Sequence, residues 1–162
     1  MTFRPDLVDV WIFRLAGDAP QMLMLHRAPG RVLAGLWQGV SGKIEMDEQI
    51  VHAALREVRE ETGITGDKIE ALYSLDSVAS FLWAPLDAVM SSVHFALRVR
   101  PDVEPARSLE HDDHRWLSFD DAIAASVWPD YRESIRRVRD CILDPERAPW
   151  FELSLAGQPI RS

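Results

Sequence analysis

The length, composition and charge of the chain exclude several broad classes of protein. Its 162 residues are enough for one ordinary domain with a hydrophobic core, and the formal charge of −8 argues against a partner that is a nucleic acid polymer, which would require a basic surface. The single cysteine, Cys141, excludes an intramolecular disulfide, and because the first residues lack the apolar core of a signal peptide and the run 79–90 is too short to span a bilayer, we expect a cytoplasmic protein with no membrane partner.

Two strands and a turn are predicted at the start of the chain. Residues 7–13 and 21–26 are rich in Val, Ile, Leu and Met, and they flank the sequence Gly-Asp-Ala-Pro at 17–20, whose composition is typical of a turn. A loop containing Pro and Gly follows, and we expect residues 37–44 to form short strand pieces.

A helix is predicted over residues 48–62. Asp47 is a suitable residue to cap its start, and Gly63 stands where a left-handed residue commonly ends a helix. At about 100° per residue, one side of this helix is mainly apolar and another gathers three glutamates. The apolar side contains Val51, Leu55, Val58 and Thr62, and the other contains Glu57, Glu60 and Glu61.

Further strands and two helices are expected after this helix. Strands are predicted over residues 69–75, 77–83, 91–99 and 114–117, and helices over residues 118–125 and 130–143. Ser118 is available to cap the first of these helices. Ile135, Val138 and Ile142 give the second helix a buried stripe.

The tail after residue 143 has no clear period. It contains three prolines, and both disorder and packing of Trp150 and Phe151 on the body are compatible with it. We place a domain at residues 1–143 and a C-terminal tail at residues 144–162.

The three glutamates predict a metal site. Carboxylates so close together repel one another and raise each other's pKa unless a cation neutralises them, and an all-oxygen site suits Mg²⁺ or Mn²⁺. Arg56 is placed to pair with Glu60 four residues later or to reach back towards Glu48. A solvated charged helix face is the alternative, but such a face needs neither Gly42 before the helix nor the adjacent Glu60-Glu61 pair.

The segment 42–64 resembles the signature of a known family. It has the pattern G-x5-E-x7-R-E-U-x-E-E-x-G-U, where U is a bulky apolar residue, and is identified as the complete signature of the Nudix hydrolases. This resemblance implies an α/β class fold, the α/β/α sandwich in which helices flank a mixed sheet. It also implies metal-dependent hydrolysis of a nucleoside diphosphate linked to another group.

A second segment narrows the resemblance. Residues 36–45, Leu-Trp-Gln-Gly-Val-Ser-Gly-Lys-Ile-Glu, are similar to the form found in dihydroneopterin-triphosphate and dATP pyrophosphohydrolases. Gly39 and Asp47 occupy variable places of that pattern, and residues 74–92 contain no substrate motif. The base or pterin preference therefore stays open.

The resemblance assigns roles to individual residues. Glu57 and Glu61 become the principal metal ligands, Glu60 an additional ligand or general base, and Glu110 a ligand or general base delivered from a loop. Arg56 is expected, from its spacing to Glu48 and Glu60, to support the metal site.

The resemblance also implies substrate contacts by residues outside the signature helix. A guanidinium fork suits phosphate, so Arg27 is expected to bind it, and Ser41 is expected to hydrogen-bond the substrate. The aromatic rings of Trp37, Phe81 and Trp83 are candidates for stacking on a flat base, although such rings are more often core residues. His94, inside a predicted strand, is interpreted as structural.

The expected substrate is a nucleoside triphosphate or a related small nucleotide. Attack of water on phosphorus would release pyrophosphate or phosphate, with Glu60 or Glu110 taking the proton. The alternatives are hydrolysis of a dinucleoside polyphosphate, ADP-ribose or NADH, isomerisation of an isoprenoid diphosphate, which needs a cysteine that Cys141 does not supply, and a non-catalytic nucleotide sensor. A homodimer is common in the family, but no stretch of this sequence demonstrates one.

Overall fold

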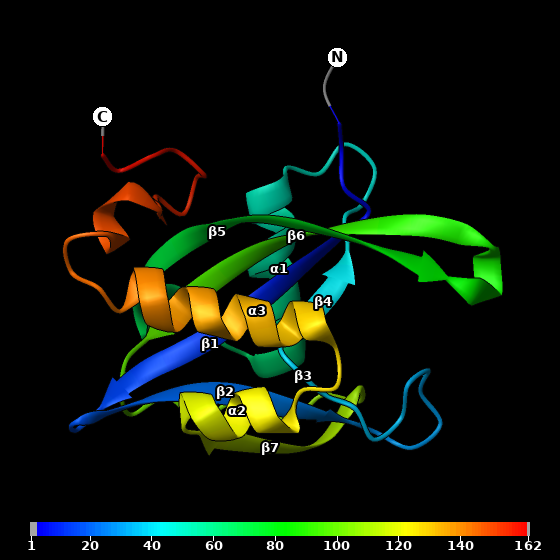
Figure 1. The fold of residues 1–162 in the computed structure, drawn as a ribbon, viewed down its shortest axis with the longest axis horizontal. Helices are drawn as coiled ribbons and strands as arrows, with labels where there is room; N and C mark the ends of the chain where they lie inside the picture. Colours follow the sequence, from blue (N-terminus) through cyan, green and yellow to red (C-terminus); the bar gives the residue numbers. More distant parts are fainter. Residues whose placement is uncertain (1–2, 162) are drawn as a thin grey trace.

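The computed structural model describes residues 3–161 and contains one mixed sheet with helices on both faces (Figure 1). The strands are β1 (Leu7–Ala16), β2 (Ala19–Arg27), β3 (Trp37–Gln38), β4 (Val40–Lys43), β5 (Ile69–Trp83), β6 (Ala88–Val99), β7 (His111–Leu117) and β8 (Glu152–Leu153). The helices are α1 (Ile50–Thr62), α2 (Phe119–Ala125) and α3 (Pro129–Arg137), with short turns at Gly66–Lys68, Ala84–Leu86, Val138–Ile142 and Ala148–Trp150.

The sheet has the order β3-β2-β1-β6-β5-β8, with β4 paired to β1 and β7 to β2. The pair β1–β6 is parallel and the other described pairs are antiparallel. Alternate residues of β1 face opposite layers, as the two-residue period of a strand requires. Val10 packs in the cluster that includes α1, whereas Trp11 packs in the cluster that includes α2 and α3. This arrangement confirms the predicted α/β sandwich.

The helix predicted over 48–62 begins two residues later than expected, and its predicted cap is wrong. Asp47 has a φ of 61°, so it occupies a left-handed turn and does not cap the helix. The helix starts at Ile50 after Gln49, which provides no side-chain cap. The Glu48 carboxylate accepts a hydrogen bond from the Glu45 N–H, and this contact closes the turn before the helix. The C-terminal prediction is confirmed, since Gly63 has a φ of 69°.

The two strands predicted over 69–75 and 77–83 are one long strand, β5. Its pairing with β6 is interrupted between Ser74 and Val78, where Asp76 has a φ of 50°. The local break in the pattern therefore marks a bulge and not a strand end. Beyond it, β5 and the start of β6 form an arm that projects from the body in Figure 1. Phe81 and Trp83 lie on this arm.

Strand β7 is also longer than predicted, because it begins at His111 and pairs with β2 along its length. The helix predicted over 118–125 is confirmed, and Ser118 accepts a hydrogen bond from the Asp121 N–H as its cap. The helix predicted over 130–143 ends at Arg137 and continues as a wider π-turn, because the Leu143 N–H donates to the Val138 carbonyl five residues earlier. The apolar spacing of this segment does not distinguish the two kinds of turn.

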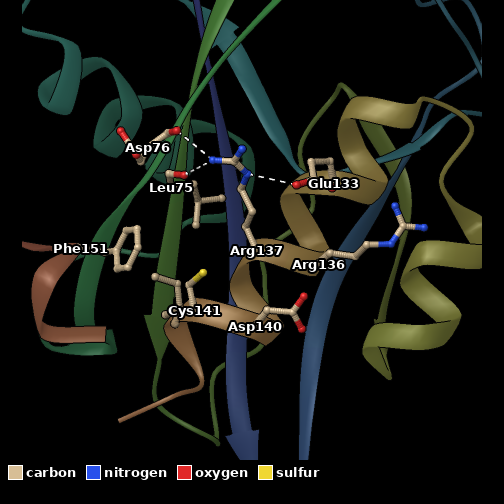
Figure 2. A pocket seen from close by; sticks show the side chains of 9 residues that line it. Leu75, Asp76, Glu133, Arg136, Arg137, Asp140, Cys141 and Phe151 are labelled. Atoms are coloured by element: carbon tan, nitrogen blue, oxygen red, sulfur yellow. Dashed lines mark hydrogen bonds and ion pairs between the residues drawn. The ribbon is translucent and has the colours of Figure 1, made fainter. Parts of the chain in front are cut away.

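The described part of the tail packs on the sheet. Strand β8 pairs with β5, and Phe151 packs on the cluster beneath α3 while Trp150 stays exposed. The hollow between α3, the π-turn and the tail holds about 350 Å³ (Figure 2). Arg137 crosses it and donates to the carbonyls of Leu75 and Asp76, so its guanidinium fixes the bulge of β5. The division at residue 143 stays a prediction.

Among residues 3–161, no helix has the length and apolar character needed to cross a membrane.

Candidate active site

Helix α1 presents the predicted carboxylates at its C-terminal half. Glu61 is only 4% exposed, and neither of its carboxylate oxygens has a partner in hydrogen-bonding geometry. The Glu57 side chain is mostly buried as well, whereas the Glu60 side chain is 52% exposed. A buried carboxylate without a donor is costly unless a cation or a proton compensates it. The chemistry of this site therefore fits a metal ion.

Gly42 makes room for this arrangement. A Cβ at position 42 would overlap the carboxylate of Glu57. The glycine before the helix is thus required by the close approach of β4 to the side chain of Glu57, which explains why the spacing from Gly42 to the helix matters.

Arg56 organises the carboxylates around it and makes both contacts that its spacing indicated. Its guanidinium donates to Glu48 at 2.8 and 2.9 Å, to Glu57 at 2.6 Å and to Glu60 at 3.3 Å. A further hydrogen bond of 2.8 Å to the carbonyl of Lys43 ties the helix to the end of β4. Charge-assisted contacts of this kind hold carboxylates in place.

The preceding turn is held by a residue that the sequence did not single out. Arg4 donates from one nitrogen to the carbonyls of Glu45 and Glu48, both at 2.7 Å. Its exposed position before β1 gave no signal, because the contact spans more than forty residues.

Burial and the neighbouring charges shift the pKa values of the site's carboxylates in opposite directions. Burial raises the pKa of Glu61 to about 10, and Glu110 and Glu57 add to this rise, which the nearby main-chain N–H of Ser41, although outside hydrogen-bonding geometry, partly offsets. Burial also raises the pKa of Glu57, although Arg56 opposes that shift. With all of its carboxylates ionised, the site would therefore carry more buried negative charge than Arg56 neutralises.

Arg56 has the reverse effect on Glu48. Its hydrogen bonds lower the pKa of Glu48 to about 2, so this carboxylate stays ionised. The two glutamates of the motif therefore differ: Glu48 is neutralised by its ion pair with Arg56, whereas Glu61 has no compensating positive charge.

Glu110 joins the site from the loop before β7, and an open cleft of about 610 Å³ lies between this loop and α1. The cleft is lined by Arg31, Glu57, Glu60, Glu61, Arg107, Ser108, Leu109 and Glu110. The Ala28 N–H donates to the Glu110 carbonyl, which fixes the loop against the end of β2. The structure thus brings all four predicted metal-binding glutamates to one place.

The two cleft arginines were missed by the sequence analysis. Arg31 and Arg107 belong to irregular loops, where no periodic pattern distinguishes a binding residue from a solvated one. A chain of net charge −8 that places two arginines beside four glutamates offers complementary charge to a phosphate and its metal ion.

The predicted substrate-binding residues lie near the cleft but do not line it. Arg27 donates from Nε to the Val32 carbonyl at 2.7 Å and so holds the loop that carries Arg31. Ser41 lies on β4 beside Glu61, as its effect on that carboxylate requires. The ring centroids of Trp37 and His26 are 4.8 Å apart, and Cζ of Arg115 lies 4.7 Å from the centroid of the Trp37 ring. Their roles in binding stay predictions.

Comparison with protein families identifies the segment that carries this site. The model of the NUDIX domain matches residues 5–138. An octanoyltransferase of Myxococcus xanthus is 27% identical over 130 residues, which are 80% of this chain and 35% of that protein. An oxidized purine nucleoside triphosphate hydrolase of Danio rerio is 31% identical over 117 residues, 67% of this chain and 71% of that protein. The chain thus spans about a third of the first relative's length.

Solved structures show the same fold. A NUDIX hydrolase structure from Listeria monocytogenes superposes with a TM-score of 0.76 and 29% identity, covering 89% of this chain and 97% of that one. The dihydroneopterin triphosphate pyrophosphohydrolase of E. coli superposes with a TM-score of 0.66 and 26% identity, covering 80% and 92%.

Proposed function

The chain belongs to the Nudix hydrolase family, and from this premise we propose that it hydrolyses a diphosphate bond in a nucleoside triphosphate or a related nucleoside diphosphate-X compound. The products would be a nucleotide and pyrophosphate or phosphate. The observation that carries the proposal is the pair of buried, unpartnered oxygens of Glu61 in a cleft that also contains Glu57 and Glu110. Nudix hydrolases generally act on such compounds with a divalent metal.

The proposed cofactor is Mg²⁺ or Mn²⁺, held by Glu57 and Glu61 of α1, with Glu60 at the exposed end of the cluster and Glu110 on the loop beside it. When bound, such an ion neutralises charge on the phosphates and makes water more acidic. Arg56 keeps Glu57 and Glu48 in position through its hydrogen bonds. Substitution of Arg56 therefore acts on catalysis through the placement of these carboxylates.

We assign phosphate binding to Arg31 and Arg107, which line the cleft beside the carboxylates. Arg27 supports the same loop and is proposed to assist them. Ser41 and Trp37 are proposed to contact the rest of the substrate from the strands next to the cleft.

Glu110 is our candidate for the general base. Glu60 is partly held by Arg56 and extends towards solvent, whereas Glu110 lies next to Glu61 on a separate loop. A base on the loop can accept the proton of an attacking water while the α1 carboxylates hold the cation. Glu110→Gln is expected to lower kcat more than Glu60→Gln does.

A panel of substrates tests the proposal. Normal and oxidised deoxynucleoside triphosphates, dihydroneopterin triphosphate, dinucleoside polyphosphates, ADP-ribose and NADH are each incubated with Mg²⁺ and with Mn²⁺, and the products are resolved by chromatography. The relatives and the sequence of β3 and β4 favour a triphosphate. Glu57→Gln and Glu61→Gln should keep the circular dichroism spectrum and lose turnover, while Glu146→Gln on the exposed tail should keep both. Near-normal rates in Glu57→Gln would refute the assignment.

The same panel tests the rival activities. An isomerase would release neither phosphate nor pyrophosphate, and its cysteine is not supplied, because Cys141 lines the hollow of Figure 2 and does not line the carboxylate cleft. A sensor would bind a nucleotide without turning it over.

We propose that the protein works in the cytoplasm on a small nucleotide, with no nucleic acid polymer or membrane as partner. The exposed apolar residues of the β5–β6 arm support a homodimer, which light scattering would detect.

A further inference from the structure

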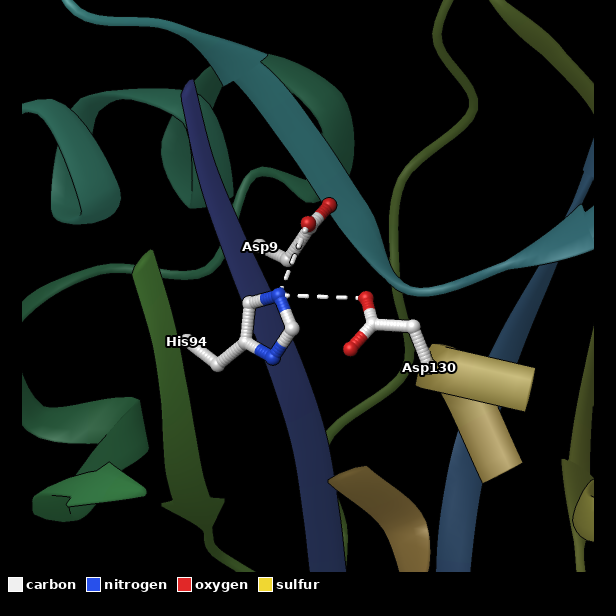
Figure 3. A group of neighbouring side chains, drawn as sticks. All are labelled: Asp9, His94 and Asp130. Atoms are coloured by element: carbon white, nitrogen blue, oxygen red, sulfur yellow. Dashed lines mark ion pairs between the residues drawn. The ribbon is translucent and has the colours of Figure 1, made fainter. Parts of the chain in front are cut away.

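A second cluster of ionisable side chains lies outside the carboxylate cleft. Asp9 of β1 and His94 of β6 are partners in the parallel register of these strands. Asp130 lies in the first turn of α3, which covers this face of the sheet. The three side chains point towards one another (Figure 3). Residues separated by 85 and 36 positions in the sequence are therefore brought to one place by the fold.

The cluster is buried and its imidazole nitrogen is unsatisfied. His94 is 0% exposed and Asp9 is 6% exposed, whereas the Asp130 side chain is 36% exposed and provides access from solvent. The Nε2 atom of His94 is 3.4 Å from a carboxylate oxygen of Asp9 and 3.3 Å from one of Asp130, yet it has no partner in hydrogen-bonding geometry. A buried ring nitrogen aimed between two carboxylates requires a cation or a proton there.

The distances do not match a charge-assisted hydrogen bond. A protonated imidazole bonded to a carboxylate would bring the two atoms to about 2.7–2.9 Å. Ligand atoms at the corners of a tetrahedron, each about 2.0–2.1 Å from a zinc ion, lie about 3.3–3.4 Å apart. The separations of 3.4 and 3.3 Å from Nε2 of His94 to the two carboxylates agree with this tetrahedral edge.

The neighbouring hydroxyl groups orient these ligands. The Nδ1 atom of His94 is 2.9 Å from Oγ of the buried Ser134, and with Nδ1–H donating to that oxygen the lone pair of Nε2 faces the carboxylates. The Ser92 hydroxyl donates to Asp9 at 2.5 Å. Such outer contacts set the tautomer of a metal-binding histidine and the orientation of a carboxylate ligand.

The charge balance also favours a divalent cation. Among the described residues, the ion pairs of Asp9 and Asp130 are made with His94 alone. Two carboxylates and a neutral imidazole carry a charge of −2, which a divalent ion cancels. We propose that Asp9, His94 and Asp130 form a second metal site, which binds Zn²⁺ or a similar transition metal ion and leaves a fourth position for water.

The donor set separates this site from the catalytic one. The cleft offers only carboxylate oxygens, which suit Mg²⁺ or Mn²⁺, whereas an imidazole nitrogen with two carboxylates suits Zn²⁺. The three ligand atoms lie within 4.8 Å of one another. The third edge of the tetrahedron joins the carboxylate oxygens of Asp9 and Asp130, and rotation of the partly exposed Asp130 side chain would adjust its length. Bound Zn²⁺ would tie the start of α3 to the centre of the sheet.

Zinc binding is measured in a protein whose catalytic site is disabled. Glu57→Gln, Glu60→Gln and Glu61→Gln are combined, the metal-free protein is titrated with Zn²⁺ alone by calorimetry, and Co²⁺ is used as a spectroscopic probe of tetrahedral geometry. We expect one Zn²⁺ per chain, and a tetrahedral Co²⁺ spectrum. The failure of this binding would leave the hydrolase proposal untouched, because no turnover is measured.

Matched variants locate the ion. Adding Asp130→Asn should abolish the unit stoichiometry, while Asp120→Asn, the same change on an exposed side chain of α2, should leave it unchanged. Binding that survives Asp130→Asn, or no binding with the cluster intact, would overturn the proposal. Should Asp130→Asn not fold, nitrogen NMR of the histidine rings decides without a variant. Zn²⁺ must shift Nε2 of His94 while Nδ1 stays protonated, and an unchanged His94 would contradict the site.

Discussion

Neutralising Glu61 is expected to stabilise the metal-free protein at neutral pH. Burial and the neighbouring carboxylates raise the pKa of Glu61 from 4.5 to about 10. Because the folded pKa lies above the unfolded one, the folded state binds more protons between these values. The stability that is fully present below pH 4.5 is therefore lost as the pH rises through this window. The variant Glu61→Gln has no such proton to lose.

The magnitude follows from the width of the window. Each pH unit within it removes about 1.4 kcal/mol from the free energy of unfolding, so the ceiling between pH 4.5 and 7.5 is about 4 kcal/mol. Glu61 shares its titration with Glu110 and Glu57, which lowers the part assigned to it. Between pH 4.5 and pH 7.5, we expect the free energy of unfolding of Glu61→Gln to rise by about 2–4 kcal/mol relative to that of the natural protein. For a chain of this size this is roughly 5–15 °C in Tm.

The assay is thermal or urea unfolding with EDTA, followed by circular dichroism at pH 4.5 and 7.5. The substitution also has a pH-independent effect on the free energy of unfolding, because it places an amide at position 61. This effect cancels when the results at the two pH values are compared. Glu60→Gln is the control, because its carboxylate is half exposed and its pH-dependent effect should stay within about 0.5 kcal/mol. Excess Mg²⁺ or Mn²⁺ should reverse the order, since the ion stabilises the folded protein that binds it. Parallel pH profiles of Glu61→Gln and the natural protein in EDTA would refute the reasoning.

Three further variants test other parts of the structure. Gly42→Ala should lower kcat by roughly 100-fold with an unchanged circular dichroism spectrum, because the new methyl group displaces the carboxylate of Glu57, which we propose binds the metal ion, and a normal kcat would contradict this. Arg56 lowers the pKa of Glu48 to about 2, so its stabilising effect is present above pH 4.5 and lost towards pH 2. In acid titrations of Tm, Glu48→Gln should lack this loss, and an identical acid slope would count against it. Phe151→Ala should cost about 1–3 kcal/mol in urea unfolding while the exposed Trp150→Ala stays within about 0.5 kcal/mol, and equal effects would argue against packing of the tail.

The carboxylate cluster was predictable because its geometry is local. Glu57, Glu60 and Glu61 share a helix, and a period of 3.6 residues is enough to place them together. The contacts of Arg56 were predictable for the same reason, since its partners lie on or just before the same helix. The start of this helix was not predicted correctly. The capping preference of an aspartate is outweighed at position 47 by a turn that needs a left-handed residue.

Residues that meet only through the sheet were not predictable in the same way. His94 was interpreted as structural because it lies inside a predicted strand. Its contact with Asp9 depends on the parallel pairing of β1 with β6, which no turn or hairpin signal specifies. Arg31 and Arg107 were missed for a related reason, since their common cleft is created by two loops that lack periodicity.

Strand β4 links the two clusters physically. Ser41 pairs in register with Asp9, and its main-chain N–H lies close enough to Glu61 to lower the pKa of that carboxylate. A displacement of β4 would therefore change the placement of ligands on both sides of it. Since the donor sets differ, we expect Zn²⁺ and Mg²⁺ to occupy the two proposed sites together, and binding of one ion should alter the affinity for the other through this strand. By linkage the effect must be reciprocal, so the shift in Mg²⁺ affinity caused by Zn²⁺ should equal the shift in Zn²⁺ affinity caused by Mg²⁺.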